Sequence, residues 1–232
     1  MTRGILIAGN ESSLFSAAAA EASKRVESFA SALIQNRFPL LDGGSGLPPK
    51  TETDGKAIPL SWNPASPIAA RTLVLAAENR LEQINDAIVI CSPPAVFKTV
   101  EALTPDEIEI LVNDHIKGWF YLIRELVQYF RRRGSGSLSL VAHEISAGGG
   151  RNAPADILGP SASASFRAFA QGALVQGAFA SHAKEAFHTM GFSTAEAGSE
   201  GDFASWFFRI IDEASGKNSG RWHKYSKLKF FR

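Results

Sequence analysis

The 232-residue chain is poor in several residue types that common functions need. A single cysteine, Cys91, excludes an internal disulfide bond and a metal site built from several cysteines. The 24 basic and 23 acidic residues nearly cancel, so the chain has no overall field that attracts nucleic acid or an anionic membrane. No run approaches the about 18 apolar residues of a membrane span, and the first apolar run is too short for a secretory signal. We therefore expect a cytoplasmic protein with no nucleic-acid or membrane partner.

Tyrosine and lysine are absent from the middle of the chain. After Tyr129 the next tyrosine is Tyr225, and after Lys117 the next lysine is Lys184. Glycine is missing as well from the stretch between Gly9 and Gly43. These gaps matter because tyrosine and lysine are among the side chains that transfer protons in enzyme sites.

Short apolar segments alternate with longer segments of helical period, which predicts a parallel sheet covered by helices. We predict one domain, residues 1–232, with a Rossmann-like, doubly wound parallel sheet of about seven strands and helices on both faces. The predicted strands are 4–8, 26–30, 57–62, 86–91, 137–142, 186–192 and 221–225, and the predicted helices are 12–24, 67–84, 104–132, 161–184 and 203–214. The polar, Gly- and Pro-punctuated segment 35–56 predicts a mobile surface loop.

The helix at 104–132 carries the clearest start signal. Thr104 is suited to cap it, Pro105 to occupy its first position and Glu107 to complete a capping box. Its apolar residues fall on one stripe of helical period, so we expect it to cover the sheet or a partner subunit.

Four segments together carry a likeness to a known family. They are DAIVICSPPAVF from Asp86, HIKGWF from His115, GSLSLVAHE from Gly136 and SASASFRAFAQGAL from Ser161. In their order, spacing and pattern of apolar residues, these segments resemble the core of the short-chain dehydrogenase/reductase family. The resemblance implies the Rossmann-like fold, and it lets each functional position of that family be checked in this chain.

The cofactor positions differ from the family pattern. The family's Thr-Gly-x-x-x-Gly-x-Gly turn is reduced to Ala8-Gly9, and its later glycines fall on Ser13 and Phe15. Neither Asp nor Arg stands near Ser31 to recognise the adenosine ribose, and the family's Asn-Asn-Ala-Gly is replaced by Ile90-Cys91-Ser92-Pro93. The residues that the resemblance places at the cofactor are Gly9, Asn10, Ser13, Leu14, Asn63 and Cys91. We assign no cofactor, and binding of NAD or NADP is disfavoured.

The catalytic positions depart further. The family's helix Asn falls on His115, its catalytic Ser on or next to His143, and its Tyr-x-x-x-Lys pair near Pro160 and Ala164. Ser139 and Ser146 lie close enough to supply a serine, but the span holds no Tyr or Lys. We therefore assign no catalytic residue of the family type. The small and polar segment 193–202 also predicts that the family's substrate lid is missing.

Other chemistry could use the same edge of the sheet. If the resemblance holds, Cys91, His115, and His143 with Glu144 lie near the carboxyl ends of neighbouring strands, where open α/β sheets bind ligands. A Cys-His or His-Glu pair suits nucleophilic or acid/base chemistry, and two His with a carboxylate suit a metal. Structural roles for these residues are the more common outcome, and we assign no metal site.

Three functions remain open. The first is a catalytically inactive member of this fold that acts by binding or oligomeric assembly. The resemblance implies a homodimer or homotetramer through the helices at 104–132 and 161–184, or assembly with an active relative. The second is an atypical NAD(P)-dependent oxidoreductase. The third is a non-redox enzyme that uses Cys91, His115 and His143.

Overall fold

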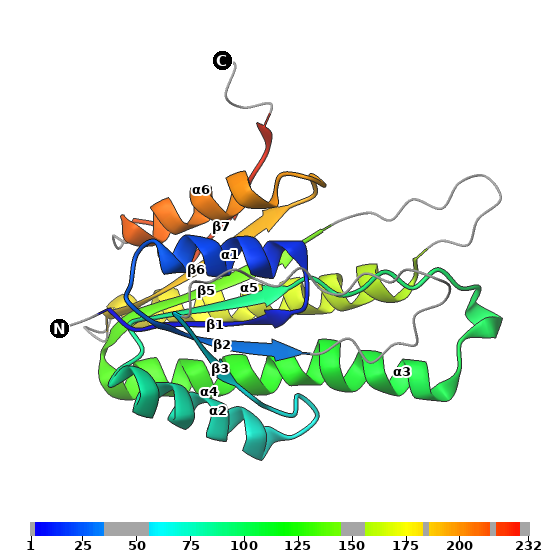
Figure 1. Ribbon diagram of the computed structural model, residues 1–232, viewed down its shortest axis with the longest axis horizontal. Coiled ribbons are helices and arrows are strands. Elements are labelled where there is room, and N and C mark those ends of the chain that lie inside the picture. The colour runs from blue at the N-terminus through cyan, green and yellow to red at the C-terminus, as the bar shows by residue number, and fades with distance from the viewer. Residues whose placement is uncertain (1–2, 35–55, 145–155, 183–185, 214–216, 228–232) are drawn as a thin grey trace.

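A computed structural model describes residues 3–34, 56–144, 156–182, 186–213 and 217–227 of the chain. Seven parallel strands form one sheet in the order β3-β2-β1-β4-β5-β6-β7 (Figure 1). The strands are β1 (Ile5–Asn10), β2 (Phe29–Ile34), β3 (Ala57–Leu60), β4 (Asp86–Cys91), β5 (Ser135–His143), β6 (Ala186–Thr194) and β7 (Arg221–Lys224). The predicted single Rossmann-like sheet is confirmed.

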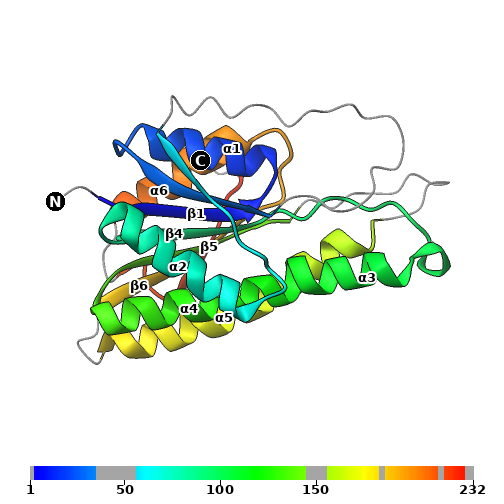
Figure 2. The ribbon, with the colours of Figure 1, turned by 60° about the horizontal axis from the view of Figure 1, so that its bottom comes forward.

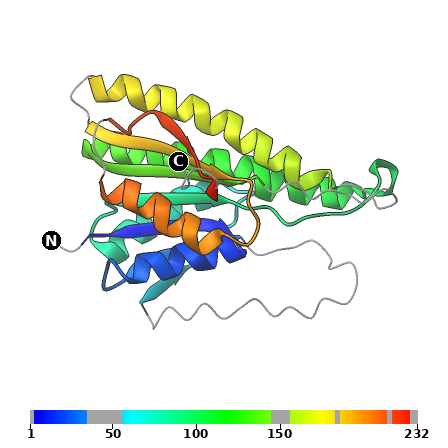
Figure 3. The ribbon, with the colours of Figure 1, turned by 90° about the horizontal axis from the view of Figure 1, so that it is seen from above.

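Helices cover both faces of this sheet. Helices α1 (Ser13–Ser23) and α6 (Glu200–Asp212) lie side by side on one face, which Figure 3 shows from above. Helices α2 (Pro67–Leu81), α4 (Gly118–Arg133) and α5 (Leu158–His182) cover the other face (Figure 2). The central strands β1 and β4 are buried along their whole length, as expected for parallel strands packed on both sides.

The predicted long helix at 104–132 is present as three consecutive segments. Helix α3 (Pro105–Val112) begins with the expected capping box, in which the Thr104 hydroxyl accepts from the Glu107 N–H and the Glu107 carboxylate accepts from the Thr104 N–H. A short π-helical segment, η2 (Asn113–Lys117), then leads into α4. The extra residue of a π turn rotates the side chains that follow it, and such turns are frequent at functional sites. A 3-10 turn, η1 (Val100–Ala102), precedes α3, which projects beyond the carboxyl ends of the strands (Figure 1).

The predicted second strand is present, but its bounds of 26–30 are wrong. The N–H groups of Arg25 and Val26 bond to the Ala22 carbonyl, so these residues belong to the turn that follows α1 and not to a strand. The strand β2 begins at Phe29 and pairs with β1 from Leu6↔Ala30 to Asn10↔Ile34. Ser31 therefore lies inside the strand rather than after it, and the residues that follow β2 lie outside the described part of the chain. The predicted mobile loop at 35–56 also lies outside it, apart from Lys56.

No helix in the described ranges is long and apolar enough to cross a membrane.

The tightest backbone approach in the sheet lies at Gly191 of β6. A Cβ atom there would stand 2.1 Å from Trp222 Cε3 on the neighbouring strand β7. We expect Gly191→Ala to displace Trp222 and to lower the free energy of unfolding by about 1–3 kcal/mol in urea denaturation. Gly172→Ala is the matched control, because Gly172 lies within α5 and its added Cβ meets no described atom within 4 Å. The control should raise stability by up to about 1 kcal/mol. Equal losses in both variants would contradict this packing.

Candidate ligand site at the carboxyl edge of the sheet

A chain of polar side chains crosses the carboxyl ends of β1, β4 and β5. The Asn10 amide Nδ2 donates to His115 Nδ1 at 2.8 Å, and Asn10 Oδ1 accepts from the Ser92 N–H at 3.0 Å. The Ser92 hydroxyl lies 3.2 Å from His143 Nδ1. His143 Nε2 lies 3.9 Å from Glu200 Oε1, at the first residue of α6. Hydrogen bonds thus join four of these residues into one polar network, and Glu200 lies beside its His143 end.

Strand pairing explains why these residues meet. Strands β4 and β5 are in register with Cys91 opposite Ala142, so Ser92 follows beside His143. Strand β1 pairs with β4 with Gly9 opposite Ile90, which brings Asn10 to the same edge. Parallel strands end at a common edge, and ligands of open α/β sheets bind there.

His115 reaches this edge from the π-helical segment. It is 1% exposed, and its ring nitrogen is held by Asn10 of β1. Helix α4, which follows this segment, packs closely against Pro64 because its first residue, Gly118, has no side chain. A Cβ at Gly118 would stand 2.6 Å from Pro64 Cβ. His115 is therefore a buried, hydrogen-bonded residue beneath the edge, and not a group that faces solvent.

His143 is buried at the end of β5, with 5% of its surface exposed. Burial lowers the pKa of His143, and the nearby Glu200 carboxylate opposes that shift without cancelling it. The imidazole is therefore neutral at pH 7, since its ordinary pKa is about 6.5. Its neighbour Glu144 is drawn away, because the Glu144 carboxylate pairs with Arg167 of α5 at 2.6 Å.

Cys91 does not share this exposed edge. It is completely buried and packs in the core on the side of α2, α4 and α5. Burial strongly raises the pKa of its thiol, so the thiolate form that acts as a nucleophile is scarce at neutral pH. Among the described contacts, no hydrogen bond joins Cys91 to His115 or His143. Ser92 is the residue that contacts His143 instead.

The turn between β1 and α1 is closed by the chain itself. A Cβ at Gly9 would stand 2.7 Å from Phe15 Cδ2, so the Phe15 ring packs directly against the Gly9 backbone. The Ser12 hydroxyl accepts from the Phe15 N–H at 3.2 Å, which satisfies one of the free amides at the start of α1. The groups that bind phosphate at a helix N-terminus are such free amides and a close glycine backbone.

The other predicted cofactor positions are arranged in different ways. Ser13 is exposed on the first turn of α1, whereas Leu14 is fully buried in the core. Asn63 is exposed in the turn before α2, and its Oδ1 accepts from the Ala65 N–H at 3.0 Å. Of the predicted set, Asn10 is a member of the polar network, and Gly9 precedes it in β1.

A cavity of about 720 Å³ opens beside the ends of β1, β2 and β3. Its lining includes Trp62 and Ser31, and its only ionisable lining groups among the described residues are the acids Glu11 and Asp114. The described lining residues include no lysine or arginine, so these residues offer no positive charge to an anionic ligand.

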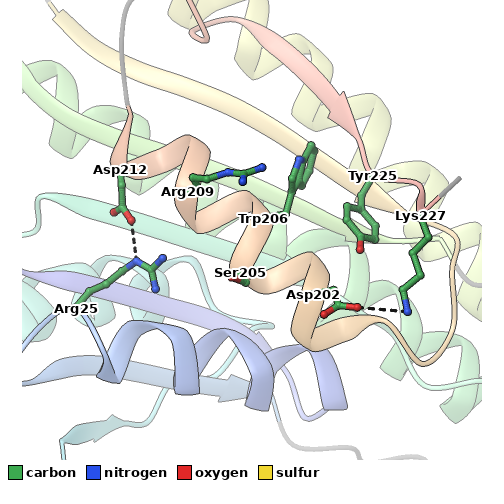
Figure 4. A pocket seen from close by; sticks show the side chains of 8 residues that line it. All are labelled: Arg25, Asp202, Ser205, Trp206, Arg209, Asp212, Tyr225 and Lys227. Carbon is green, nitrogen blue, oxygen red and sulfur yellow. Dashed lines mark hydrogen bonds and ion pairs between the residues drawn. The ribbon is translucent and has the colours of Figure 1, made fainter. Parts of the chain in front are cut away.

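A second hollow, of about 620 Å³, lies on the outer side of α6 (Figure 4). Trp206 and Tyr225 stand between two ion pairs, Arg25 with Asp212 at 2.8 Å and Lys227 with Asp202 at 3.3 Å. Each of these lining carboxylates is paired with a cation, and Arg209 is a third cation in the lining. We assign it no function.

Among the described residues, no group of three or more His, Cys, Asp or Glu side chains is arranged to hold a metal ion. The alternative of a metal at two histidines and a carboxylate therefore gains no support.

Sequence reasoning missed the roles of Ser92 and Glu200. In the sequence Ser92 stands only in the motif that replaces the family's Asn-Asn-Ala-Gly, and Glu200 stands in the small and polar segment that predicts a missing lid. The signal that could have identified Ser92 is the pairing of β4 with β5, because Ser92 and His143 each stand at the end of one of these strands. Glu200 had no comparable signal, because the start of α6 was predicted at Phe203, three residues late.

No protein-family model matches the sequence, and no curated protein matches it either. Solved structures do match the fold. A short chain dehydrogenase from Mycobacterium smegmatis matches with a TM-score of 0.70 and 13% identity over 97% of this chain and 93% of its own. The NADH-dependent reductase A1-R', complexed with NAD, has a TM-score of 0.67 and 14% identity over 97% and 95% of the two chains. Levodione reductase has a TM-score of 0.60 and 16% identity over 96% and 85%. This likeness concerns the backbone arrangement, and the chain has the fold of the short-chain dehydrogenases and reductases.

Proposed function

We propose that this protein keeps the short-chain dehydrogenase/reductase fold without its hydride-transfer chemistry and acts by binding or oligomeric assembly. The observation that carries this proposal is the closed turn between β1 and α1. The Phe15 ring occupies the space against Gly9, and the Ser12 hydroxyl already caps the Phe15 amide. A dinucleotide pyrophosphate needs that space and those amides.

Charge supports the same proposal. The cavity at the ends of β1 to β3 lies where the adenosine half of a dinucleotide would enter an open α/β sheet, and its described ionisable lining is acidic. Two or more negative charges on the cofactor would face Glu11 across this cavity. Like charges in a partly enclosed site disfavour binding.

The catalytic positions support it too. The positions that the resemblance gives to the family's Tyr and Lys fall near Pro160 and Ala164, both exposed on the first turns of α5. Neither side chain can transfer a proton. Loss of one general acid costs about 10²–10⁴ in rate, and loss of groups that act together costs up to about 10⁶.

An atypical NAD(P)-dependent oxidoreductase is the second candidate. It is favoured by the solved NADH-dependent reductase complexed with NAD, whose backbone this chain matches over 97% of its length. This candidate requires that Phe15 move away from Gly9 when a dinucleotide enters.

Thermal shift with NADH and NADPH separates the two candidates. A ligand bound with a dissociation constant of about 10 μM and added at 1 mM stabilises the folded state by about 2.7 kcal/mol, or roughly 5–10 °C for a chain of this size. We expect a change of less than about 1 °C at 1 mM of either cofactor. A saturable shift of several degrees would favour the oxidoreductase.

Assembly is proposed to use the outer surfaces of α4 and α5, which adjoin on one face of the sheet (Figure 2). Phe120 of α4 and Phe169 of α5 stack at 4.0 Å and join the two helices into one surface. Along α5, Ala164, Ala168 and Val175 are exposed on one side, and Val175 is 55% exposed. The small residues allow a second copy to approach closely, and an active relative with the same fold is the other possible partner.

A charge placed on this surface tests the assembly. We expect the unmodified protein to run as a dimer or tetramer in size-exclusion chromatography with light scattering. Ala168→Arg should shift it to the monomer, because an unpaired guanidinium would be buried between the copies. The matched control is Ile68→Arg, at an apolar position of α2 that is 76% exposed and outside the α4–α5 surface. A monomeric unmodified protein, or the same behaviour in both variants, would contradict the proposed interface.

A further inference from the structure

Ser92, His143 and Glu200 form a line of three side chains that the proposed function does not use. The Ser92 hydroxyl is 3.2 Å from His143 Nδ1, and the opposite ring nitrogen, Nε2, is 3.9 Å from a Glu200 oxygen. A hydroxyl within reach of a base, with the base oriented by a third group, is the arrangement of an activated nucleophile, and such contacts are often longer before substrate binds.

We propose that Ser92 is a nucleophile that accepts acyl groups from activated esters or thioesters, with His143 as its base and Glu200 as the group that orients the base. This inference does not rest on the proposed function, because it involves neither a dinucleotide nor a second subunit.

The protonation states fit these roles. A neutral His143 with its proton on Nε2, toward Glu200, leaves the Nδ1 lone pair free to accept the Ser92 proton. His143 Nε2 is buried and has no hydrogen-bond partner among the described atoms. The Glu200 carboxylate, 3.9 Å away, is placed to accept this proton after a small movement. Burial lowers the pKa of His143, which keeps the imidazole neutral and able to act as a base at pH 7.

The position of Ser92 is also fixed. Its N–H is held by Asn10 Oδ1 at 3.0 Å, and Asn10 is in turn held by His115. Ser92 is partly exposed whereas His143 is buried, so the nucleophile lies nearer to solvent than its base. A nucleophile held in place by a second layer of hydrogen bonds loses little freedom when it reacts.

The residues after Ser92 narrow the substrate class. Nucleophilic serines commonly use the N–H of the next residue to stabilise the oxyanion, and Pro93 and Pro94 have no N–H. One missing oxyanion donor costs about 10²–10³ in rate. Substrates with a good leaving group, such as aryl esters and acyl thioesters, are less sensitive to this loss than alkyl esters or amides.

The reaction balances without a cofactor. Ser92 Oγ forms a bond to the acyl carbon while its proton moves to His143 Nδ1. The bond from the acyl carbon to the leaving oxygen or sulfur then breaks, and the leaving group takes that proton. Water attacks the acyl-serine with Nδ1 as base, which releases the carboxylic acid and restores Ser92.

Incubation of the full chain with 4-nitrophenyl acetate tests the proposal. We expect a burst of nitrophenolate and an acetyl group on Ser92, located by peptide mass spectrometry. Ser92→Ala should abolish both, and His143→Gln should slow acetylation at Ser92 by about 10²-fold or more. The matched control is Ser23→Ala, on the last turn of α1, where the hydroxyl bonds only to the Ala20 carbonyl among the described contacts. It should leave the burst unchanged.

The pH profile separates a base from a merely structural histidine. Acetylation should rise with pH as His143 loses its proton, with a midpoint below about 6.5. Glu200→Gln removes the charge that favours the protonated ring, so the midpoint should fall further while the rate drops several-fold. Because Glu200 is partly exposed, we expect Glu200→Gln to fold, so it tests the proposal even if His143→Gln does not fold. Absence of acetyl at Ser92 would overturn the proposal. So would acetylation in both the His143→Gln and the Glu200→Gln variants at the rate and with the pH dependence of the unmodified protein.

Discussion

The parallel pairing of β1, β4 and β5 is the constraint on which the rest of this structure depends. Both faces of β1 and β4 are buried, so a slip of one residue would move every side chain from the helix layer it packs against to the layer on the opposite face of the sheet. This packing fixes their register with one another and with β5. The same register decides which residues stand together where the strands end. Asn10, Ser92 and His143 meet at that edge for this reason alone.

The fold keeps the edge at which similar proteins bind ligands, but the chain fills that edge with its own side chains. The Phe15 ring takes the space beside Gly9, and the Ser12 hydroxyl takes an amide of the helix start. Asn10, Ser92 and His143 also hydrogen-bond within the chain at this edge, in contacts that join Asn10 to Ser92 and Ser92 to His143. Desolvation of unpaired polar groups is costly, so this internal network also stabilises the edge without a ligand.

Much of the fold could be predicted from the sequence, because a buried parallel sheet leaves strong apolar runs. The strand at 86–91 and the capping box at Thr104 were predicted at the residues where they occur. The predicted strand at 26–30 starts too early because Val26 and Phe29 are both apolar and either could begin a strand. Only the hydrogen bonds to Ala22 show that Val26 belongs to the turn after α1. The site was less predictable: Glu200 reaches His143 across 57 positions of sequence, and no local pattern encodes such a contact. Burial also separated Cys91 from its neighbour Ser92, which the sequence alone did not distinguish.

The central claim is that the turn between β1 and α1 is closed to a dinucleotide. The most direct measurement is a titration of NADH into ¹⁵N-labelled protein, following the backbone amide signals of residues 9–16 by NMR. We expect these signals to stay in place up to millimolar NADH, because Phe15 and Ser12 already occupy the phosphate position. Saturable shifts of the same signals at micromolar NADH would contradict the account and show that the turn opens to receive the cofactor.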